Sequence, residues 1–383
     1  MTGLSVENSY PEDWGGDVPL FASRRWLEVM AGRIEGEPLW FSTRAARGVR
    51  VGLAGYLVTD PGAYPFGNVA ALAASQASPF APRGVRDVFA ATPLPRPDLF
   101  PHLLLTWPGY ASFPVGPGHD DARAVRDALA RVVGWAADGR AAAVAIPYAP
   151  GGSVLAGEAR QLGFASIPLT HDATLPVPAG GFVEFLERLT AHRRRRVAAE
   201  RRAWRDRGLR AWRVERVTAG LLDRMALLRA AHRSRYAITC DPADERARIA
   251  ALLDRLGGAV DLFAAGTDTA GDPADVLCFS LFVRDRATWH ALYFGADGGV
   301  PRSRGGYFEA VFYTPIEHGE DLGMAEISFG LGASRAKLLR GCVLTPVECL
   351  LAPTTERAGP TIAGIAQAWR ATDTDAREGL HDR

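Results

Sequence analysis

The chain has 383 residues and a formal net charge of +1, and 48% of its residues are hydrophobic. This length and composition predict two domains with buried cores and exclude a disordered or strongly polyionic chain. No apolar stretch reaches the roughly 18 residues that a membrane-spanning helix needs, and the first residues lack the pattern of a signal peptide. We therefore expect a cytoplasmic protein.

The common catalytic and metal-binding motifs do not occur in the sequence. The four cysteines form no C-x-x-C pair, and there is no G-x-S-x-G, H-E-x-x-H or Walker motif. The usual hydrolase, zinc protease and nucleoside triphosphatase functions therefore have no support. We expect no metal site and no cofactor, only an acyl donor as co-substrate.

The first half of the chain predicts a mixture of strands and helices. Apolar runs predict strands at 38–43, 51–58, 102–107 and 142–148, and helical spacing predicts helices at 120–138 and 153–163. The Pro-, Gly- and Ala-rich segment 60–101 has no apolar period and is predicted to be a long loop.

The second half has the clearer pattern. Segment 182–207 has apolar residues at helical spacing, and a strand (209–217) and two helices (219–233, 243–256) are predicted after it. Three strand-like runs follow (AVDLFAA, DVLCFSLFV and TWHALYFGA), and the short Arg284-Asp285-Arg286 turn predicts a hairpin between the last two. A Gly- and Arg-rich loop then leads to a helix (307–320), a strand (AEISFG), a short helix (ASRAKLLR) and a final strand (CVLTPVECLL).

The resulting order, β-α-α-β-β-β-α-β-α-β, resembles that of the GNAT acyltransferase fold. A doubly wound sheet would alternate strand and helix throughout, which this order does not. We therefore expect an α+β protein with a mixed sheet and two tandem GNAT-like domains. The predicted boundaries are 1–178 for an N-terminal domain on the acceptor side, 179–352 for the catalytic domain, and 353–383 for a polar tail with one helix near 362–371.

The block YFEAVFYTPIEHGEDLGMAEISFGLGASRAKLLRG, residues 307–341, carries a more specific signal. Its first part resembles the F-E-x-x-Y-Y-x-x-I helix of the FemAB-like, or peptidoglycan-biosynthesis-type, family, with Phe312 in place of one aromatic residue. Its last part resembles the family's G-A-x-x-x-x-K-x-x-R-G signature nearly in spacing, although Ser334-Arg335 departs from the usual residues. The resemblance covers most of the chain and implies transfer of an acyl or aminoacyl group to an amine.

Four residues are catalytic candidates. Glu309 and Tyr313 share one helix face, so Glu309 would deprotonate the attacking amine while Tyr313 protonates the leaving group. Asp297, at the end of a strand, is the second candidate base. Lys337, with Arg340 three residues later, would stabilise the oxyanion of a tetrahedral intermediate or a phosphate. The alternatives are a carboxylate that complements the helix dipole for Glu309 and a core aromatic for Tyr313.

Lys337 is the only lysine in the chain, beside 43 arginines. Arginine is therefore the default cation of this sequence. Because a compact ammonium differs chemically from a planar guanidinium, the position of Lys337 is expected to require an ammonium. The alternative is that some position simply retained the last lysine.

The loop before the 307–320 helix is the predicted site for the phosphates of the donor. Its glycines allow close approach, and a helix start offers backbone N–H groups. It partly resembles the R/Q-x-x-G-x-G/A loop of CoA-dependent GNAT enzymes, and the alternative is an ordinary flexible loop. The predicted donor-binding residues are Arg302, Ser303, Arg304, Gly305, Gly306, Tyr307, which stands where a small residue is expected, and Arg340.

Segment 182–207 holds nine arginines against four acidic residues. Such a stripe is typical of a surface that binds a phosphate backbone, with Trp204 and Trp212 as stacking candidates. A solvated helix face is the alternative, because arginine is the default cation here. The predicted RNA-binding residues are Arg193, Arg194, Arg195, Arg196, Arg201 and Arg202.

Together these features predict an amide-forming acyltransferase. The favoured reaction moves an aminoacyl group from aminoacyl-tRNA to the amine of a small molecule or peptide, of natural-product or cell-wall type. The alternatives are an N-acyltransferase that uses acyl-CoA or an acyl-carrier protein, and a non-catalytic GNAT-like binding protein. The sequence leaves open the acyl group, the acceptor and the oligomeric state.

Overall fold

The computed structural model describes residues 3–11, 14, 18–45, 48–63, 65–75, 80–91, 96–109, 111–235, 240–267, 272–297 and 305–381. The chain forms two compact units, which we call unit 1 (Met1–His171 and Thr345–Arg383) and unit 2 (Asp172–Leu344). The chain passes from unit 1 to unit 2 within strand β6 (Ala165–Pro176) and returns within strand β12 (Val343–Pro353).

The sheet of unit 1 has the strand order β1-β2-β3-β4-β5-β12. Among the strand pairs of unit 1 whose registers are described, β4–β5 is parallel and the others are antiparallel. The apolar sides of α4 (Ala122–Ala137) and α5 (Val154–Gln161) pack on one face of this sheet and form its main core. The other strands are β1 (Leu4–Glu7), β2 (Glu37–Ala45), β3 (Gly48–Val58), β4 (His102–Leu105) and β5 (Ala143–Pro150).

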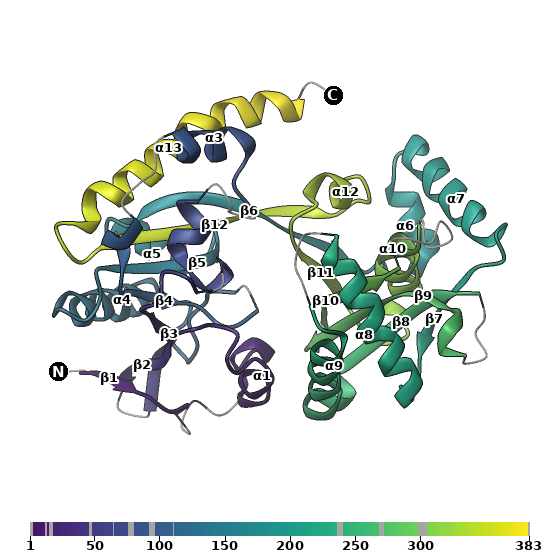
Figure 1. The fold of residues 1–383 in the computed structure, drawn as a ribbon, viewed down its shortest axis with the longest axis horizontal. Coiled ribbons are helices and arrows are strands. Elements are labelled where there is room, and N and C mark those ends of the chain that lie inside the picture. Colours follow the sequence, from purple (N-terminus) through teal and green to yellow (C-terminus); the bar gives the residue numbers. More distant parts are fainter. Residues whose placement is uncertain are drawn as a thin grey trace. The chain divides into compact units, whose positions relative to one another are not determined.

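The predicted loop at 60–101 is wrong in part, because this segment contains two helices, α2 (Val69–Ala73) and α3 (Arg83–Ala91). Helix α2 has only five residues, too few to show an apolar period, and it depends on the Asn68 side chain, which accepts hydrogen bonds from the Ala70 and Ala71 N–H groups. In α3 the apolar residues Val85, Val88 and Phe89 do recur at helical spacing, but over only two turns. Helix α13 (Ala358–His381, yellow) packs against α3 (Figure 1). A further short helix, α1 (Arg24–Val29), precedes β2.

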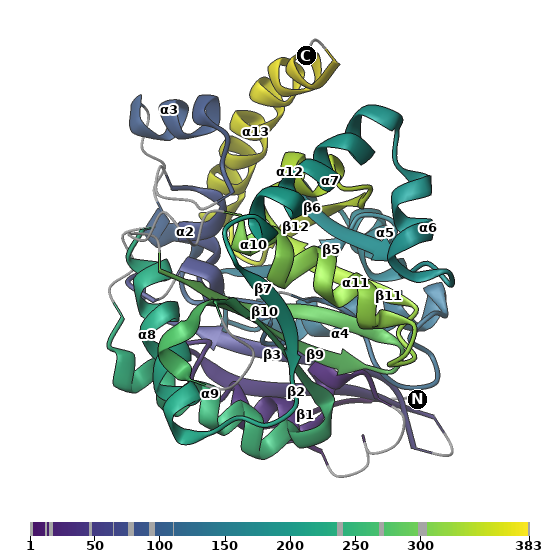
Figure 2. The same ribbon diagram turned by 90° about the vertical axis from the view of Figure 1, so that its right-hand side faces the viewer.

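The sheet of unit 2 has the strand order β6-β11-β10-β9-β8-β7. Its elements follow the predicted order: β7 (Arg210–Val214), α8 (Ala219–Ser234), α9 (Pro242–Leu256), β8 (Val260–Gly266), β9 (Val276–Asp285), β10 (Thr288–Ala296), the helix α10–α11, β11 (Glu326–Leu331), α12 (Ser334–Leu338) and β12. Helices α8 and α9 lie on one face and the α10–α11 helix on the other (Figure 2). The fold class is thereby confirmed.

The α10–α11 helix contains a π-helical turn. It runs through α10 (Gly306–Phe308), the π turn Glu309–Tyr313 and α11 (Thr314–Gly319). Pro315 explains the wide turn, because in an α-helix its ring would clash with the carbonyl group of Val311, four residues earlier. All five residues of the π turn are buried.

The predicted helical segment 182–207 is two helices, α6 (Gly181–Arg188) and α7 (Ala191–Arg205). The break occurs because Leu189 is extended and the Thr190 hydroxyl accepts a hydrogen bond from the Arg193 N–H, which caps a new helix. No helix in the described part of the chain is long and apolar enough to cross a membrane.

Candidate functional site

The parallel strands β10 and β11 pair over only three residues each. Thr288–His290 pairs with Glu326–Ser328, and beyond these residues the register between the two strands ends. A register shift between Ala291 and Tyr293 also bends β10 against β9. The strands therefore part at their carboxyl ends, the edge of a sheet where α/β folds bind ligands. We call the region between Ala291–Ala296 and Phe329–Leu331 the β10–β11 divergence.

The helix that follows β10 starts with two glycines. The backbone conformation requires Gly305, and close packing against neighbouring side chains requires Gly306. Gly305 has a φ of +94°. A Cβ atom on Gly306 would lie 2.4 Å from the Cys278 sulfur and 3.1 Å from the Trp204 ring. Tyr307 is half-buried, with its ring edge against Phe294. The other predicted donor-binding residues of this loop, Arg302, Ser303 and Arg304, lie outside the described residues.

Glu309 lies in the π turn and is 3% exposed. Its carboxylate accepts a hydrogen bond from Arg201 Nε at 3.3 Å, and a second carboxylate, Glu317, accepts from Arg201 Nη2 at 3.1 Å. Burial raises the pKa of Glu309, and the Arg201 guanidinium opposes this rise. Glu309 is thus held inside unit 2 by a residue that was predicted to bind RNA.

Tyr313 and Arg340 meet at the one carboxylate of α7, Glu200. The Tyr313 hydroxyl donates to Glu200 Oε2 at 2.6 Å, and Arg340 Nη2 donates to the same oxygen at 2.9 Å. Tyr313 is fully buried, and burial together with this hydrogen bond raises its pKa. The Arg340 guanidinium also lies 3.1 Å from the centre of the Phe308 ring. Tyr313 and Arg340 therefore connect Glu200 of α7 to the α10–α11 helix.

Lys337 is buried in α12, with 3% of its surface exposed. Its ammonium donates to the carbonyl oxygens of Phe329, Gly330 and Leu331 at 2.8, 2.7 and 3.1 Å. These three bonds use all three N–H groups of an ammonium. Burial lowers the pKa of Lys337 to about 8. The geometry thus gives Lys337 a different task from the predicted contact with an oxyanion.

Asp297 has a different location from the other three catalytic candidates. It follows the carboxyl end of β10 directly and is half-buried, and its backbone N–H donates to the Leu277 carbonyl at 3.2 Å. It therefore lies at the rim of the β10–β11 divergence, whereas Glu309, Tyr313 and Lys337 are buried in the core. Among the described residues, no group of three His, Cys, Asp or Glu side chains is arranged to hold a metal ion.

The arginines of α7 fall into two sets. Arg201 points inward, with 15% of its side chain exposed. Arg193 is half-buried and donates to the Leu338 carbonyl, whereas Arg194, Arg195, Arg196, Arg202 and Arg205 are exposed. Arg195 and Arg202 have no side-chain partner among the residues that the structure describes. The predicted RNA-binding residues are therefore divided between the exposed face and the interior of unit 2.

The signal that separates these sets is the helical period. Val197, Glu200, Arg201 and Trp204 recur at the spacing i, i+3, i+4, i+7, which defines one face of a helix. Two of these positions are charged, so a search for apolar residues alone missed Glu200 and misplaced Arg201. A charged residue within an apolar stripe indicates a buried ion pair.

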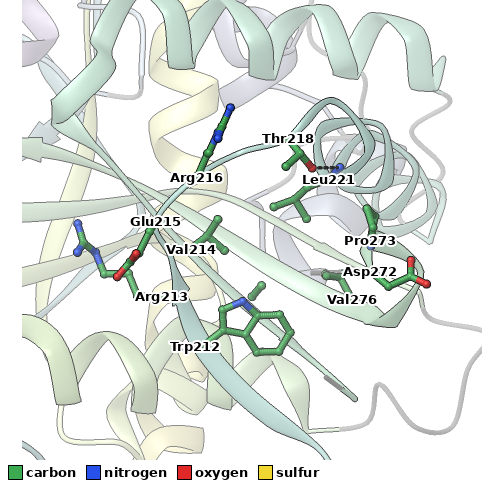
Figure 3. A pocket seen from close by; sticks show the side chains of 11 residues that line it. Trp212, Arg213, Val214, Glu215, Arg216, Thr218, Leu221, Asp272, Pro273 and Val276 are labelled. Atoms are coloured by element: carbon green, nitrogen blue, oxygen red, sulfur yellow. Dashed lines mark hydrogen bonds between the residues drawn. The ribbon is translucent and has the colours of Figure 1, made fainter. Parts of the chain in front are cut away.

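A shallow groove of about 380 Å³ lies beside the edge strand β7 (Figure 3). Trp212 and Val214 of β7, Leu221 of α8 and Pro273 line it. The Thr218 hydroxyl at its upper side accepts from the Leu221 N–H and caps α8. Trp212 is thus exposed to a groove, but Trp204 is 2% exposed, so the expectation that Trp204 stacks on a ligand is wrong.

No protein-family model and no curated protein sequence matches the chain. Among solved structures, the chain is similar to FemX, with 13% sequence identity, a TM-score of 0.52 and coverage of 85% of this chain and 90% of that chain. L-PGS from Bacillus licheniformis (10% identity, TM-score 0.46, 70% and 82% coverage) and a tandem GNAT protein from the clavulanic acid biosynthesis pathway (11%, 0.44, 92% and 99%) also match. The FemX match shows the fold. The chain thus has a FemX-like fold, as the resemblance to the FemAB-like family implies.

Proposed function

We propose that this chain is an amide-forming transferase that moves an aminoacyl group from aminoacyl-tRNA to an amine. The observation that carries this proposal is the composition and exposure of α7. Its 15 residues include seven arginines and one glutamate, and five of those arginines are exposed. An exposed basic helix face is the electrostatic feature expected for a phosphate backbone. The likeness of the fold to FemX supports the same conclusion.

In this proposal the aminoacyl ester lies in the β10–β11 divergence, at the carboxyl ends of two parallel strands. The acceptor amine attacks the ester carbonyl, a C–N bond forms, and the C–O bond to the tRNA ribose breaks. Asp297 takes the proton that the amine loses and returns it to the ribose oxygen. Glu309 has no place in this step, because Arg201 and burial hold it inside the unit.

The glycine start of the α10–α11 helix would accept a phosphate group of the donor. This part of the proposal fits an acyl-CoA donor equally well. The RNA donor is preferred because the exposed arginines of α7 extend over about three helical turns, which suits a long polyanion better than one pyrophosphate.

The decisive experiment incubates the pure protein with aminoacyl-tRNAs and, separately, acyl-CoA thioesters, each with a panel of amines, and detects amides by mass spectrometry. We expect product only with aminoacyl-tRNA, and its loss after RNase treatment. Product that survives RNase and needs a CoA thioester would replace the proposal with the acyl-CoA alternative. Absence of turnover alongside tight RNA binding would indicate a binding protein.

A double charge reversal tests the role of α7. We expect Arg195→Glu/Arg202→Glu to weaken tRNA binding at least tenfold and to reduce the salt dependence of log Kd by about one unit for each lost phosphate contact. The matched control is Arg83→Glu/Arg86→Glu on the exposed side of α3, which changes the net charge equally. An equal effect of both variants would show that only net charge matters.

A further inference from the structure

The end of β11 has an unusual backbone conformation. Its register with β6 shifts between Ser328 and Leu331, and its pairing with β10 has already ended at Ser328. Gly330, between these positions, has a φ of +66°. We call Phe329–Leu331 the β11 turn. Phe329 and Gly330 have no partner in either register, whereas Leu331 pairs again with Asp172 of β6. Carbonyl groups that leave the ladder in this turn need another donor.

That donor is the Lys337 ammonium, which donates hydrogen bonds to three consecutive carbonyl oxygens of the β11 turn within 3.1 Å. Three carbonyl groups converge on one point only because Gly330 adopts a left-handed conformation. An ammonium presents three N–H groups from one atom in a tetrahedral arrangement, whereas a guanidinium presents its N–H groups in one plane. The contact therefore suits lysine and not arginine.

We infer that Lys337 is a positioning residue, whose ammonium fixes the β11 turn and so sets the shape of the β10–β11 divergence where the acyl donor binds. This explains why the one lysine of a chain with 43 arginines stands here. It also couples Lys337 to Gly330, because neither can form the contact without the other. The link to the acyl donor rests on the proposed function, but the link to the β11 turn does not.

The Phe329 side chain connects the β11 turn to the opposite helix. Its ring stacks on Phe312 of the π turn, with centroids 4.0 Å apart and planes 17° apart. Loss of the ammonium contact would therefore free the strand end and also loosen the packing under the π turn. The effect should extend to the residues that border the divergence.

The test compares Lys337→Met, Lys337→Arg and Gly330→Ala with Arg335→Met, an exposed residue of the same helix. Thermal unfolding and amide hydrogen exchange of peptides that cover 326–332 need no substrate. We expect Lys337→Met to lower Tm by about 5–10 °C and to speed exchange in this peptide at least tenfold, with Lys337→Arg nearly as damaging. Arg335→Met should match the wild type in both measurements.

Gly330→Ala strains the backbone of the β11 turn and leaves the Lys337 side chain unchanged. A Cβ atom at this position has no neighbour within 4 Å, so only the positive φ opposes alanine, and Tm should fall by about 2–4 °C. In the double variant Gly330→Ala/Lys337→Met the Tm loss should be smaller than the sum of the single losses, since without the ammonium residue 330 is no longer held at a positive φ. Additive losses would overturn the coupling.

Kinetics separate positioning from direct catalysis. If Lys337 acts through the β11 turn, Gly330→Ala and Lys337→Met should raise KM for the acyl donor in the same order as they speed exchange in peptide 326–332. Two results would overturn the inference: wild-type Tm and exchange in Lys337→Arg, or a hundredfold loss of kcat in Lys337→Met with unchanged exchange and Tm. If no acyl donor is found, the exchange and Tm results still decide the structural part.

Discussion

Each unit contains a parallel strand pair, β4–β5 in unit 1 and β10–β11 in unit 2. The two units differ in what lies between the carboxyl ends of these strands. In unit 1, β4 and β5 pair over His102–Leu104 and Ala143–Ala145 and then part, as β10 and β11 do in unit 2. In unit 1 a side chain of the following loop bridges the parting strands. The Ser112 hydroxyl hydrogen-bonds to the carbonyl oxygens of Leu105 on β4 and Pro147 on β5.

The helices that follow these strand pairs also differ, because one has a side-chain cap at its start and the other does not. Helix α4 of unit 1 starts at Asp121, whose carboxylate accepts from the N–H groups of Arg123 and Ala124 and pairs with Arg50 at 2.6 Å. The α10–α11 helix of unit 2 starts at Gly305, which offers no side chain to its N–H groups. The anion position at the helix start is therefore filled by the chain itself in unit 1. This difference teaches that repeated topology need not repeat a binding site.

Asp297 gives the largest expected effect. If unit 2 is the catalytic unit, Asp297→Asn should lower kcat at least a hundredfold, because the amine loses its proton acceptor. Tm should change by no more than about 2 °C, since Asp297 is at the rim of the divergence and not in the core. Single-turnover rates and thermal unfolding provide the measurement, and a wild-type rate in this variant would remove Asp297 from the proposed mechanism.

His102, at the start of the parallel pair in unit 1, gives the next largest effect. It is fully buried, and burial lowers its pKa to about 3. Between pH 6.5 and pH 3 the unfolded chain binds a proton that the folded unit does not, so stability is lost as pH falls through this window. At about 1.4 kcal/mol per pH unit, the loss attributable to His102 should reach roughly 3 kcal/mol at pH 4.

The variant His102→Gln tests this loss of stability, because glutamine does not titrate in this pH range. Its amide oxygen can still accept the hydrogen bond that the Val69 N–H donates to His102 Nε2 at 3.4 Å. Urea unfolding of both proteins at pH 7 and pH 4 gives the measurement. Between pH 7 and pH 4 the free energy of unfolding should fall by roughly 3 kcal/mol more in the wild type than in His102→Gln. Parallel pH curves for the two proteins would show that His102 takes no part in acid sensitivity.

Strand and helix positions in unit 2 could be predicted because apolar periods and turn residues are local features. The hairpin of β9 and β10, for example, depends on two apolar runs and the short turn between them. The environment of Lys337 could not be predicted in the same way. It depends on the positive φ of Gly330, which the residue type permits but does not require, and on the point where the earlier strand β10 stops pairing with β11, which is a non-local feature. The sequence therefore singled out Lys337, but it did not indicate that the ammonium contacts three carbonyl groups of the chain itself.

The smallest expected effect concerns Asp121, the residue that distinguishes the helix start of unit 1. Asp121→Ala should lower Tm by roughly 1–3 °C, because two N–H groups at the start of α4 lose their acceptor. Asp121→Asn should retain most of that stability, since an amide oxygen also accepts these bonds. Asp120→Ala, at the exposed neighbouring carboxylate, is the matched control and should have no effect. Because acyl transfer is assigned to unit 2, all three variants should keep the wild-type kcat. A loss of kcat in Asp121→Ala without a larger loss of stability would mean that unit 1 takes part in catalysis and that its capped helix is not a purely structural feature.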